Sequence, residues 1–218
     1  MSKPVTFLVV DDHPVFRQGL VALIESNERY RVGAEAGSVP AALEAFERSA
    51  PDIALIDISL LDQNGLDLVK QLKARHPEVP ALIISMHDEA VYAARALRAG
   101  ARGYVMKQEA ASVMLDAIKT VLAGRIYVST AMHDRLLETM FTQRDEQDTL
   151  PVDRLSDREL EVLELIGQGY GATEIARILS LSVKTVNAYR DHLKEKLSID
   201  NAGELRRFAV NWIRSRDS

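Results

Sequence analysis

Short apolar runs alternate with stretches of helical periodicity along the first 123 residues of the chain. Most of these runs are apolar at nearly every position, as in strands that are buried on both faces of a sheet. This alternation predicts a parallel sheet with helices packed on both of its faces. The predicted strands are 6–10, 30–36, 53–56, 81–85 and 103–106, and the predicted helices are 15–25, 39–49, 65–75, 89–99 and 110–123.

The pattern changes after residue 150, where only helical periodicity remains. Ser156 and Glu159 have the spacing of a capping box, in which each side chain accepts a hydrogen bond from the other residue's backbone N–H. A separate all-helical domain is therefore predicted at this end of the chain. The helix that begins there is expected to bury Leu160, Val162, Leu163, Leu165 and Ile166.

The segment 124–150 connects these two parts of the chain. Residues 129–141 repeat apolar side chains at helical spacing, which predicts a helix. Residues 142–149 are polar throughout and predict an exposed linker. We therefore expect an α/β domain at 1–123, then this linker segment with its one helix, and a helical domain at 151–218.

The composition is that of a soluble globular protein, with 218 residues of which 47% are apolar and 27% are charged. Because the sequence has no cysteine, disulfides, thiolate metal sites and cysteine nucleophiles are excluded. Neither a signal peptide nor a run of about 20 apolar residues is present, which predicts a cytoplasmic protein that does not contact the membrane. The charge is uneven, because residues 1–150 carry 16 Lys/Arg against 21 Asp/Glu whereas residues 151–218 carry 11 of each.

Polar side chains stand at the ends of four predicted strands. Asp11 and Asp12 follow the first strand, Asp57 follows the third, Ser85 ends the fourth, and Lys107 follows the fifth. The carboxyl ends of parallel strands lie at one edge of a sheet, so these side chains are expected to meet there. Any one of them alone is more often structural, but all five in this arrangement favour a joint site.

Three neighbouring carboxylates would raise one another's pKa values unless a cation lies between them. Mg²⁺ suits such a site, because it takes oxygen ligands and keeps waters and phosphate oxygens beside one or two carboxylates. Asp57 would then be a nucleophile that forms an aspartyl-phosphate. Mg²⁺ and Lys107 would neutralise charge on the phosphoryl oxygens, and Ser85 would donate a hydrogen bond to one of them.

The first domain resembles the receiver domain of two-component response regulators. The resemblance covers about residues 4–123 and rests on "VDDHP", "LIDISL…NG", "IIS" and "GYVMK". It implies a flavodoxin-like, doubly wound α/β fold with five parallel strands in the order 2-1-3-4-5. It also implies Asp57 as the phosphoacceptor, assisted by Lys107 and Ser85, and Ser85 with Tyr104 as the switch pair. The implied Mg²⁺ ligands are Asp11, Asp12 (the more direct of the two), Asp57 and the backbone carbonyl of Ser59.

Three positions differ from the usual receiver pattern. Leu61 stands where proline is common, so the loop after Asp57 is expected to be looser. Gln108 stands where proline often follows the lysine, so a cis peptide bond is not expected there. Met86 replaces a small residue after Ser85 and is expected to crowd the phosphoryl group.

The segment "EIARILSLSVKTVNAYRDHLKEKL" predicts two helices with a tight break at Ser180-Leu181. Ser182 is a candidate N-cap of the second helix. A short helix that presents lysine and asparagine outward suits the major groove of DNA. The alternative is an amphipathic pair in a plain helical bundle, which the neutral charge of the domain favours. The apolar side of the second helix is expected at Val183, Val186, Leu193 and Leu197, with Lys184, Asn187, Ala188, Asp191 and Lys194 facing away.

Residues 153–200 resemble the LuxR-type helix-turn-helix of the NarL/FixJ subfamily, through "RELEVL", "EIA" and "SVKTV". The resemblance implies a four-helix DNA-binding domain whose helix-turn-helix spans about Glu174 to Leu193 and whose last helix also pairs two copies. Asn187 and Tyr189 stand where the subfamily most often has a basic residue and a histidine, so the base preference is expected to differ from the subfamily average. The residues implied to contact DNA are Lys184, Thr185, Asn187, Ala188, Tyr189, Arg190, Asp191 and Lys194.

Acidic residues on the second helix weigh against tight DNA binding by one copy of the domain. Asp191 and Glu195 would each repel phosphate, and neutralised phosphates supply much of the affinity of such proteins. Asp191 either accepts a hydrogen bond from a cytosine amino group or weakens binding. Two copies on paired half-sites would compensate for a weak single contact.

The two resemblances together imply a phosphorylation-controlled transcription factor rather than an enzyme, since a receiver assists only its own phosphoryl transfer and dephosphorylation. A sensor histidine kinase would phosphorylate Asp57, and the product would favour a homodimer on promoter DNA, with RNA polymerase as a further candidate partner. Two alternatives stay open. A phosphohydrolase of the haloacid-dehalogenase kind needs a second aspartate where this chain has Ser59. A constitutive DNA-binding protein has no need of the acidic pocket.

Overall fold

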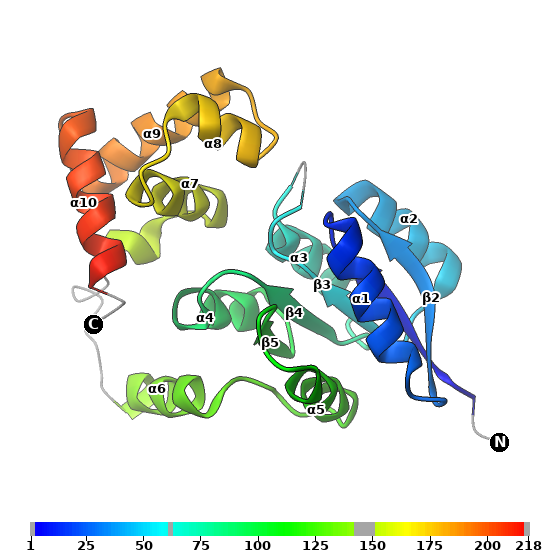
Figure 1. Cartoon of the computed structure of the whole chain (residues 1–218). Helices are drawn as coiled ribbons and strands as arrows, with labels where there is room; N and C mark the ends of the chain where they lie inside the picture. Colours follow the sequence, from blue (N-terminus) through cyan, green and yellow to red (C-terminus); the bar gives the residue numbers. More distant parts are fainter. Residues whose placement is uncertain (1–2, 61–62, 142–150, 216–218) are drawn as a thin grey trace. The chain divides into compact units, whose positions relative to one another are not determined.

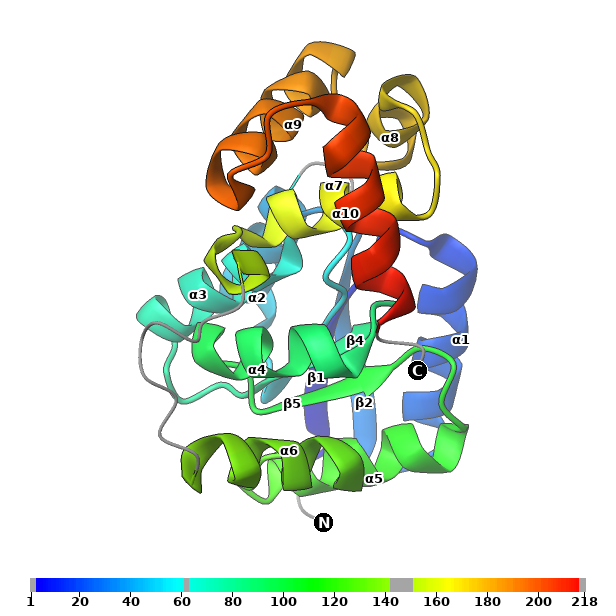
Figure 2. The same ribbon diagram turned by 90° about the vertical axis from the view of Figure 1, so that its left-hand side faces the viewer.

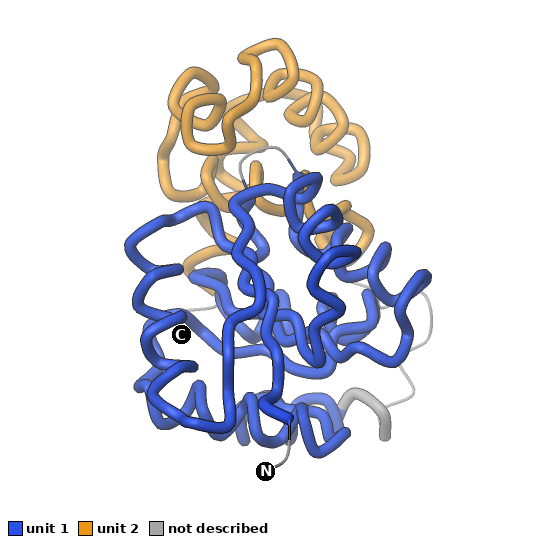
Figure 3. The backbone as a smooth tube through the Cα atoms, turned by 90° about the vertical axis from the view of Figure 1, so that its right-hand side faces the viewer, with its two compact units in different colours: residues 1–142 blue, residues 143–218 orange. Residues whose placement is uncertain are grey.

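The computed structural model describes residues 3–60, 63–141 and 151–215. The chain divides into two compact units, residues 1–142 and 143–218, coloured separately in Figure 3. The looser loop expected at Leu61 and the polar linker expected at 142–149 lie outside the described residues. No helix in the described part of the chain has the length and apolar character needed to cross a membrane.

The first unit contains a five-stranded parallel sheet in the order β2-β1-β3-β4-β5, as predicted (Figure 1). The chain adds β2 on one side of β1 and β3 on the other, so the order reverses between β1 and β3. Ligand sites of open parallel sheets lie at such a reversal, beyond the carboxyl ends of the strands. The strands are β1 (Val5–Val10), β2 (Tyr30–Ala36), β3 (Ile53–Ile56), β4 (Ala81–Ser85) and β5 (Gly103–Met106).

Two layers of helices bury the sheet. Helices α1 and α5 pack on the face that carries Phe7, Leu55 and Ile84, three residues that are at most 2% exposed. Helices α2, α3 and α4 cover the other face, which carries Ile56 and Ile83. Burial on both sides explains why these strands are apolar at nearly every position. The helices are α1 (Pro14–Glu25), α2 (Val39–Ser49), α3 (Gly65–Arg75), α4 (Glu89–Ala99) and α5 (Ala111–Leu122).

The chain after α5 is tied to the β5 edge of the sheet. Tyr127 pairs with Gly103 in a parallel bridge, and a Cβ at position 103 would lie only 2.8 Å from the Tyr127 carbonyl oxygen. The backbone N–H of Ser129 donates to Glu89 Oε1 at 2.8 Å. Helix α6 (Thr130–Phe141), the helix expected in this segment, then packs against α4 and buries Met132.

The described residues of the second unit form helices and the turns between them, as predicted. Ser156 and Glu159 form the predicted capping box, with Ser156 N–H to Glu159 Oε2 at 2.7 Å and Glu159 N–H to Ser156 Oγ at 3.3 Å. Helix α10 lies across α7 (Figure 2), in contact at Gly167, where a Cβ would lie 2.6 Å from the Ala209 carbonyl oxygen. The elements are η2 (Pro151–Arg154), α7 (Asp157–Gly167), α8 (Ala172–Ile178), α9 (Val183–Leu197) and α10 (Ala202–Arg214).

The predicted helical core is wrong at one residue, and two others are less deeply buried than expected. Val183 is 41% exposed, because α7 and α8 cover the turns of α9 that carry Val186 and Leu193 and leave its first residue in solvent. Leu165 and Leu197 are only partly buried. The structure also buries three glutamates of α7 that the apolar pattern did not identify, Glu159, Glu161 and Glu164.

An ion pair compensates one of these buried glutamates. Arg158 Nη1 lies 2.6 Å from Glu161 Oε2, and Arg158 Nη2 donates to the Leu179 carbonyl oxygen at 3.0 Å. This arginine therefore connects α7 to the C-terminal end of α8. Such a contact stabilises a buried carboxylate only when its hydrogen bonds are satisfied, which is the case here.

Candidate functional site

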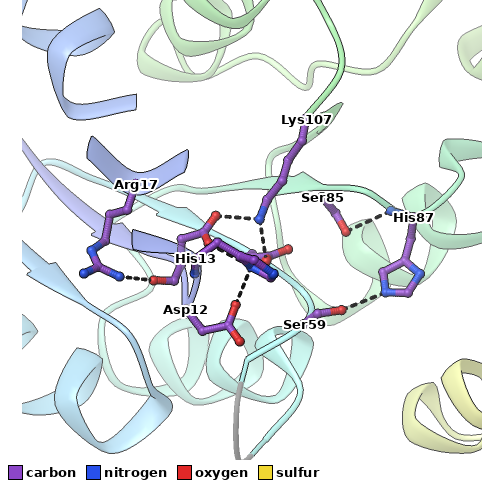
Figure 4. A network of polar contacts seen from close by, with 9 residues as sticks. Asp12, His13, Arg17, Ser59, Ser85, His87 and Lys107 are labelled. Atoms are coloured by element: carbon purple, nitrogen blue, oxygen red, sulfur yellow. Dashed lines mark hydrogen bonds and ion pairs between the residues drawn. The ribbon is translucent and has the colours of Figure 1, made fainter. Parts of the chain in front are cut away.

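The five predicted side chains lie together at the carboxyl edge of the sheet (Figure 4). Asp11, Asp57, Ser85 and Lys107 are all buried, and Asp12 is partly exposed. Each stands at or within two residues of a strand end, because the parallel register aligns the ends of β1, β3, β4 and β5. The sheet therefore brings together groups that are far apart in the sequence.

Lys107 connects two of the acidic side chains. Its Nζ lies 2.6 Å from Asp11 Oδ2 and 2.7 Å from Asp57 Oδ2, and 4.6 Å from the centroid of the Phe16 ring. One ammonium thus compensates two buried carboxylates. The face of the Phe16 ring also packs against this ammonium. Without this partner, each buried carboxylate would cost several kcal/mol to keep ionised.

The remaining carboxylate oxygens form a candidate cation site. Asp12 Oδ1 and Asp57 Oδ1 are buried and have no hydrogen-bond partner among the described residues. Buried polar atoms normally have a partner, so these two oxygens indicate that something binds between them. Donor atoms of Asp11, Asp12, His13 and Asp57 lie within 4.8 Å of one another, and this donor set fits a divalent cation.

Burial alters the acidity of two of these groups. It raises the pKa of Asp57 to about 6, against the opposing effect of Lys107 and with a further increase from Asp11 and Asp12. It also raises the pKa of Asp12, which nearby His13 partly counteracts. Both shifts show that the pocket disfavours negative charge unless a cation compensates it.

Asp57 is expected to make the receiver less stable as the pH rises through about 6 in metal-free buffer. A carboxyl group with a raised pKa contributes stability that is present below its unfolded value and is lost once the folded group ionises. The shift from 3.8 to about 6 corresponds to about 3 kcal/mol. Asp57→Asn, which cannot ionise, should therefore gain about 3 kcal/mol over wild type between about pH 4 and pH 7.

Native-state hydrogen exchange of the β1 and β3 amides measures this difference in the receiver itself. Asp116→Asn, at an exposed position on α5, provides the matched control and should not change with pH relative to wild type. A stability gap between Asp57→Asn and wild type that stays constant across this pH range would show that burial does not raise the pKa of Asp57.

The predicted switch pair is connected through a third residue, His87. The His87 N–H donates to Ser85 Oγ at 3.2 Å, and the Tyr104 hydroxyl donates to the His87 carbonyl oxygen at 2.7 Å. His87 Nε2 lies 2.9 Å from Ser59 Oγ, and its ring packs on Tyr92. The loop between β4 and α4 is therefore held both to the loop after Asp57 and to the buried ring of Tyr104.

The loops at this edge contain further contacts that were not predicted. Arg17 of α1 donates to the Asp11 carbonyl oxygen and pairs with Glu35 of β2 at 3.1 Å. Asn64 caps α3 by accepting from the Leu66 N–H at 2.8 Å. Asn64 belongs to the "NG" of the receiver resemblance, but neither that motif nor the positions of Arg17 and Glu35 in the sequence specify a partner.

The structure describes two of the three positions that differ from the usual receiver pattern, Gln108 and Met86. Among the described residues there is no cis peptide bond, so the trans linkage expected at Gln108 is confirmed. The side chain of Met86 is 63% exposed, and the crowding expected of it stays a prediction.

The second helix of the predicted helix-turn-helix is α9. The predicted N-cap is confirmed, since Ser182 Oγ accepts from the Thr185 N–H at 3.0 Å. Ser180 lies between α8 and α9 with a left-handed φ of 52°, which makes the predicted break. Of the residues implied to contact DNA, Lys184, Asn187, Ala188 and Asp191 are exposed and Thr185, Tyr189, Arg190 and Lys194 are partly exposed.

An ion pair occupies the middle of this exposed face. Lys194 Nζ lies 2.9 Å from Asp191 Oδ1, and its hydrogen bond lowers the pKa of that carboxyl. Asp191 is therefore ionised at neutral pH and neutralises part of the charge of a lysine that could otherwise contact phosphate.

The chain matches two protein-family models in succession. Residues 7–119 match the response regulator receiver domain, and residues 153–209 match the bacterial regulatory proteins of the luxR family. The first match ends inside α5, and the second spans the helices from α7 to most of α10.

Curated relatives align along almost the whole chain. The oxygen regulatory protein NreC of Staphylococcus aureus (strain JH9) is 35% identical over 208 residues, which are 93% of this chain and 95% of NreC. The transcriptional regulatory protein DegU of Brevibacillus brevis is 27% identical over 230 residues, covering 99% of this chain and 98% of DegU.

Solved structures give the same architecture. A two-component response regulator of the LuxR family from Aurantimonas sp. SI85-9A1 is 31% identical, with a TM-score of 0.59, and covers 63% of this chain and 99% of its own. RcsB from Salmonella enterica serovar Typhimurium, bound to promoter P1flhDC in the presence of the phosphomimetic BeF3⁻, is 25% identical, with a TM-score of 0.61. That match covers 95% of this chain and 98% of RcsB.

Proposed function

Since the chain belongs to the two-component response regulators that join a receiver domain to a LuxR-type DNA-binding domain, we propose that phosphorylation of Asp57 controls binding of α9 to promoter DNA. Family membership makes the protein a transcription regulator and removes the phosphohydrolase alternative. The observation that best supports the proposal is the environment of the two carboxylate oxygens of Asp57. One of its oxygens contacts Lys107, and the other is buried without a hydrogen-bond partner in the described part of the chain.

The phosphoryl donor is a phosphohistidine of a sensor histidine kinase. Asp57 Oδ1 attacks the phosphorus, the new O–P bond forms as the N–P bond breaks, and the released imidazole takes up a proton. Lys107 Nζ, 2.7 Å from Asp57 Oδ2, compensates the charge that arrives with the phosphoryl oxygens. Ser85 Oγ already accepts from His87, so its own proton is available to donate to a phosphoryl oxygen.

Mg²⁺ fits the oxygen-rich side of the same pocket. Asp11, Asp12, Asp57 and the backbone carbonyl of Ser59 would hold it, with Asp12 and Asp57 providing their buried oxygens that lack partners among the described residues. When bound, the ion neutralises charge on the carboxylates and on the transferred phosphoryl group.

The contacts of His87 suggest how phosphorylation reaches the rest of the receiver. When the Ser85 hydroxyl turns toward the phosphoryl group, the β4–α4 loop follows through the His87 N–H. The same loop is held by Tyr104 through the His87 carbonyl, and the Tyr104 N–H donates to the Tyr127 carbonyl at the sheet edge. These contacts end at Tyr127, in the segment that leads to the second unit. The β4–α4 loop would then have two arrangements, and phosphorylation would favour one of them.

DNA binding is assigned to the exposed face of α9. Asn187 has the two side-chain groups that pair with the N6 and N7 edge of adenine, and Ala188 suits a thymine methyl group. Lys184 and Arg190 would neutralise phosphates. A homodimer on two half-sites, paired through α10, would provide the affinity that one copy with no net charge lacks.

Asp191→Asn is expected to raise the affinity for non-specific DNA severalfold at low salt. The exchange removes a negative charge from the DNA-binding face and releases Lys194 from the ion pair. The slope of log affinity against log salt concentration should become steeper, and fluorescence anisotropy of a labelled duplex measures both quantities. Asp116→Asn removes the equivalent Asp–Lys pair on α5 and should change neither. A loss of affinity for all sequences in Asp191→Asn would count against this placement.

The proposed control is tested by comparing DNA affinity in the two phosphorylation states. DNA sites are selected from a random duplex library with the full-length chain, then titrated with and without acetyl phosphate and Mg²⁺. We expect wild type to bind its selected site more tightly, and with dimer stoichiometry, after treatment. Asp57→Asn should bind identically in both conditions. Equal affinities of wild type in the two conditions would leave a constitutive DNA-binding protein as the better description.

A further inference from the structure

An imidazole nitrogen lies among the acidic side chains of the receiver pocket (Figure 4). His13 Nδ1 is 2.7 Å from Asp12 Oδ1 and 3.5 Å from Asp11 Oδ1. Together with an oxygen of Asp57, these donor atoms lie within 4.8 Å of one another. The cluster is therefore not purely a set of oxygen ligands.

The close approach of His13 to Asp12 is an ion-pair contact that lacks hydrogen-bond geometry. Asp12 Oδ1 has no hydrogen-bond partner among the described residues, although His13 Nδ1 lies 2.7 Å away. Neighbouring ligand atoms of one metal ion lie at a similar separation, about 3 Å for bonds of about 2.1 Å at right angles. The unpartnered Oδ1 of the buried Asp57 is a third donor of the same group.

The backbone, rather than side-chain packing, holds His13 in this position. Its N–H donates to Asp11 Oδ1 at 2.8 Å, and its carbonyl oxygen accepts from the Arg17 N–H at 3.0 Å in the first turn of α1. Pro14 follows and keeps the backbone of His13 extended. The side chain itself is 65% exposed, so it can be exchanged without disturbing the core.

We propose that His13 is a ligand of the receiver's cation site and makes the site bind first-row transition ions such as Mn²⁺ more tightly than Mg²⁺. Oxygen donors suit both Mg²⁺ and Mn²⁺, whereas an imidazole nitrogen suits first-row transition ions and not Mg²⁺. Manganese accepts both donor types, so the three carboxylates and the imidazole form one mixed ligand set. The inference rests on the cation site proposed above and adds to it one ligand and a metal preference.

Electron paramagnetic resonance of the full-length protein titrated with Mn²⁺ measures the affinity directly, and competition with Mg²⁺ gives the second constant. His13→Ala is expected to lower the affinity for Mn²⁺ about tenfold or more, as loss of a group that supports a metal site does. Its affinity for Mg²⁺ should stay that of wild type. His133→Ala, at an exposed position on α6, should change neither constant.

A spectroscopic signal separates direct ligation from an indirect effect on Asp12. Electron spin echo modulation of bound Mn²⁺ should show nitrogen coupling in wild type and in His133→Ala, and no such coupling in His13→Ala. Equal Mn²⁺ affinity in wild type and His13→Ala, or nitrogen coupling that persists in His13→Ala, would overturn the assignment of His13 while leaving the Mg²⁺ site intact. If Asp12→Asn bound both ions as wild type does, the cation site itself would be refuted.

Discussion

Lys107→Met is expected to abolish phosphoryl transfer to Asp57 and to destabilise the receiver by about 3–5 kcal/mol at neutral pH. The exchange keeps the length of the aliphatic chain but removes the ammonium that contacts both Asp11 and Asp57. Two buried carboxylates then face each other without compensation, and the incoming phosphoryl oxygens lose their protein cation.

The destabilisation of Lys107→Met should depend on pH in a defined direction. Loss of the ammonium penalises only the ionised carboxylates, so the cost should be largest above the pKa of Asp57, about 6, and should shrink as the pH falls below it. Hydrogen exchange of the β1 and β3 amides reports the stability, and a phosphate-affinity gel after acetyl phosphate treatment reports the transfer.

Lys119→Met provides the matched control for this prediction. Lys119 forms an exposed i,i+3 pair with Asp116 on α5, and such a pair contributes at most about 1 kcal/mol. Wild-type levels of phosphorylation in Lys107→Met would show that the ammonium does not act on the phosphoryl group, whatever its effect on stability.

Gly65→Ala is the second substitution with a large expected effect, both on stability and on phosphorylation. A Cβ at this position would overlap the carbonyl oxygen of Asp57 and would lie 2.8 Å from its carbonyl carbon and 3.0 Å from the Cα of Ile58. All three are backbone atoms of residues 57 and 58, so no side-chain rotation can relieve the contact. We expect a loss of about 3 kcal/mol or more, together with displacement of Asp57 and loss of phosphorylation.

Gly19→Ala tests whether the loss of stability expected for Gly65→Ala comes from the crowding at that position and not from replacing a glycine as such. Gly19 lies within α1, and apart from its chain neighbours and the backbone of its own helix no described atom lies within 4 Å of a Cβ built there. Alanine at that position should stabilise the helix by about 0.5–1 kcal/mol. Thermal unfolding followed by circular dichroism compares the two variants, and a Gly65→Ala protein as stable as wild type would contradict the geometry of this loop.

The sheet and its rim were predictable because one physical rule determines them. Strands buried on both faces must be apolar, so the runs that end at Val10, Ile56, Ser85 and Met106 could be recognised from hydrophobicity alone. Because the strands are parallel, the side chains that follow their carboxyl ends must lie at the same edge of the sheet. Cap signals are equally local, which is why the roles of Ser156 and Ser182 followed from the sequence.

Contacts that depend on the path of a loop could not be predicted in this way. His13 reaches the acidic pocket and His87 bridges to Ser59 because of backbone turns that leave no apolar or polar period in the sequence. Val183 has the spacing of a core residue, yet its exposure depends on where α7 and α8 end. Burial of Glu161 likewise depends on Arg158 being within reach, which the apolar pattern of α7 does not encode.

Control by phosphorylation requires Asp57 to be the single acceptor of a phosphoryl group, and mass spectrometry of the full-length protein tests this most directly. After incubation with acetyl phosphate, we predict one phosphoryl adduct in the peptide that contains Asp57, formed with Mg²⁺, strongly reduced in EDTA, and absent from Asp57→Asn. An adduct of equal yield in Asp57→Asn, or one located on a peptide without Asp57, would contradict it.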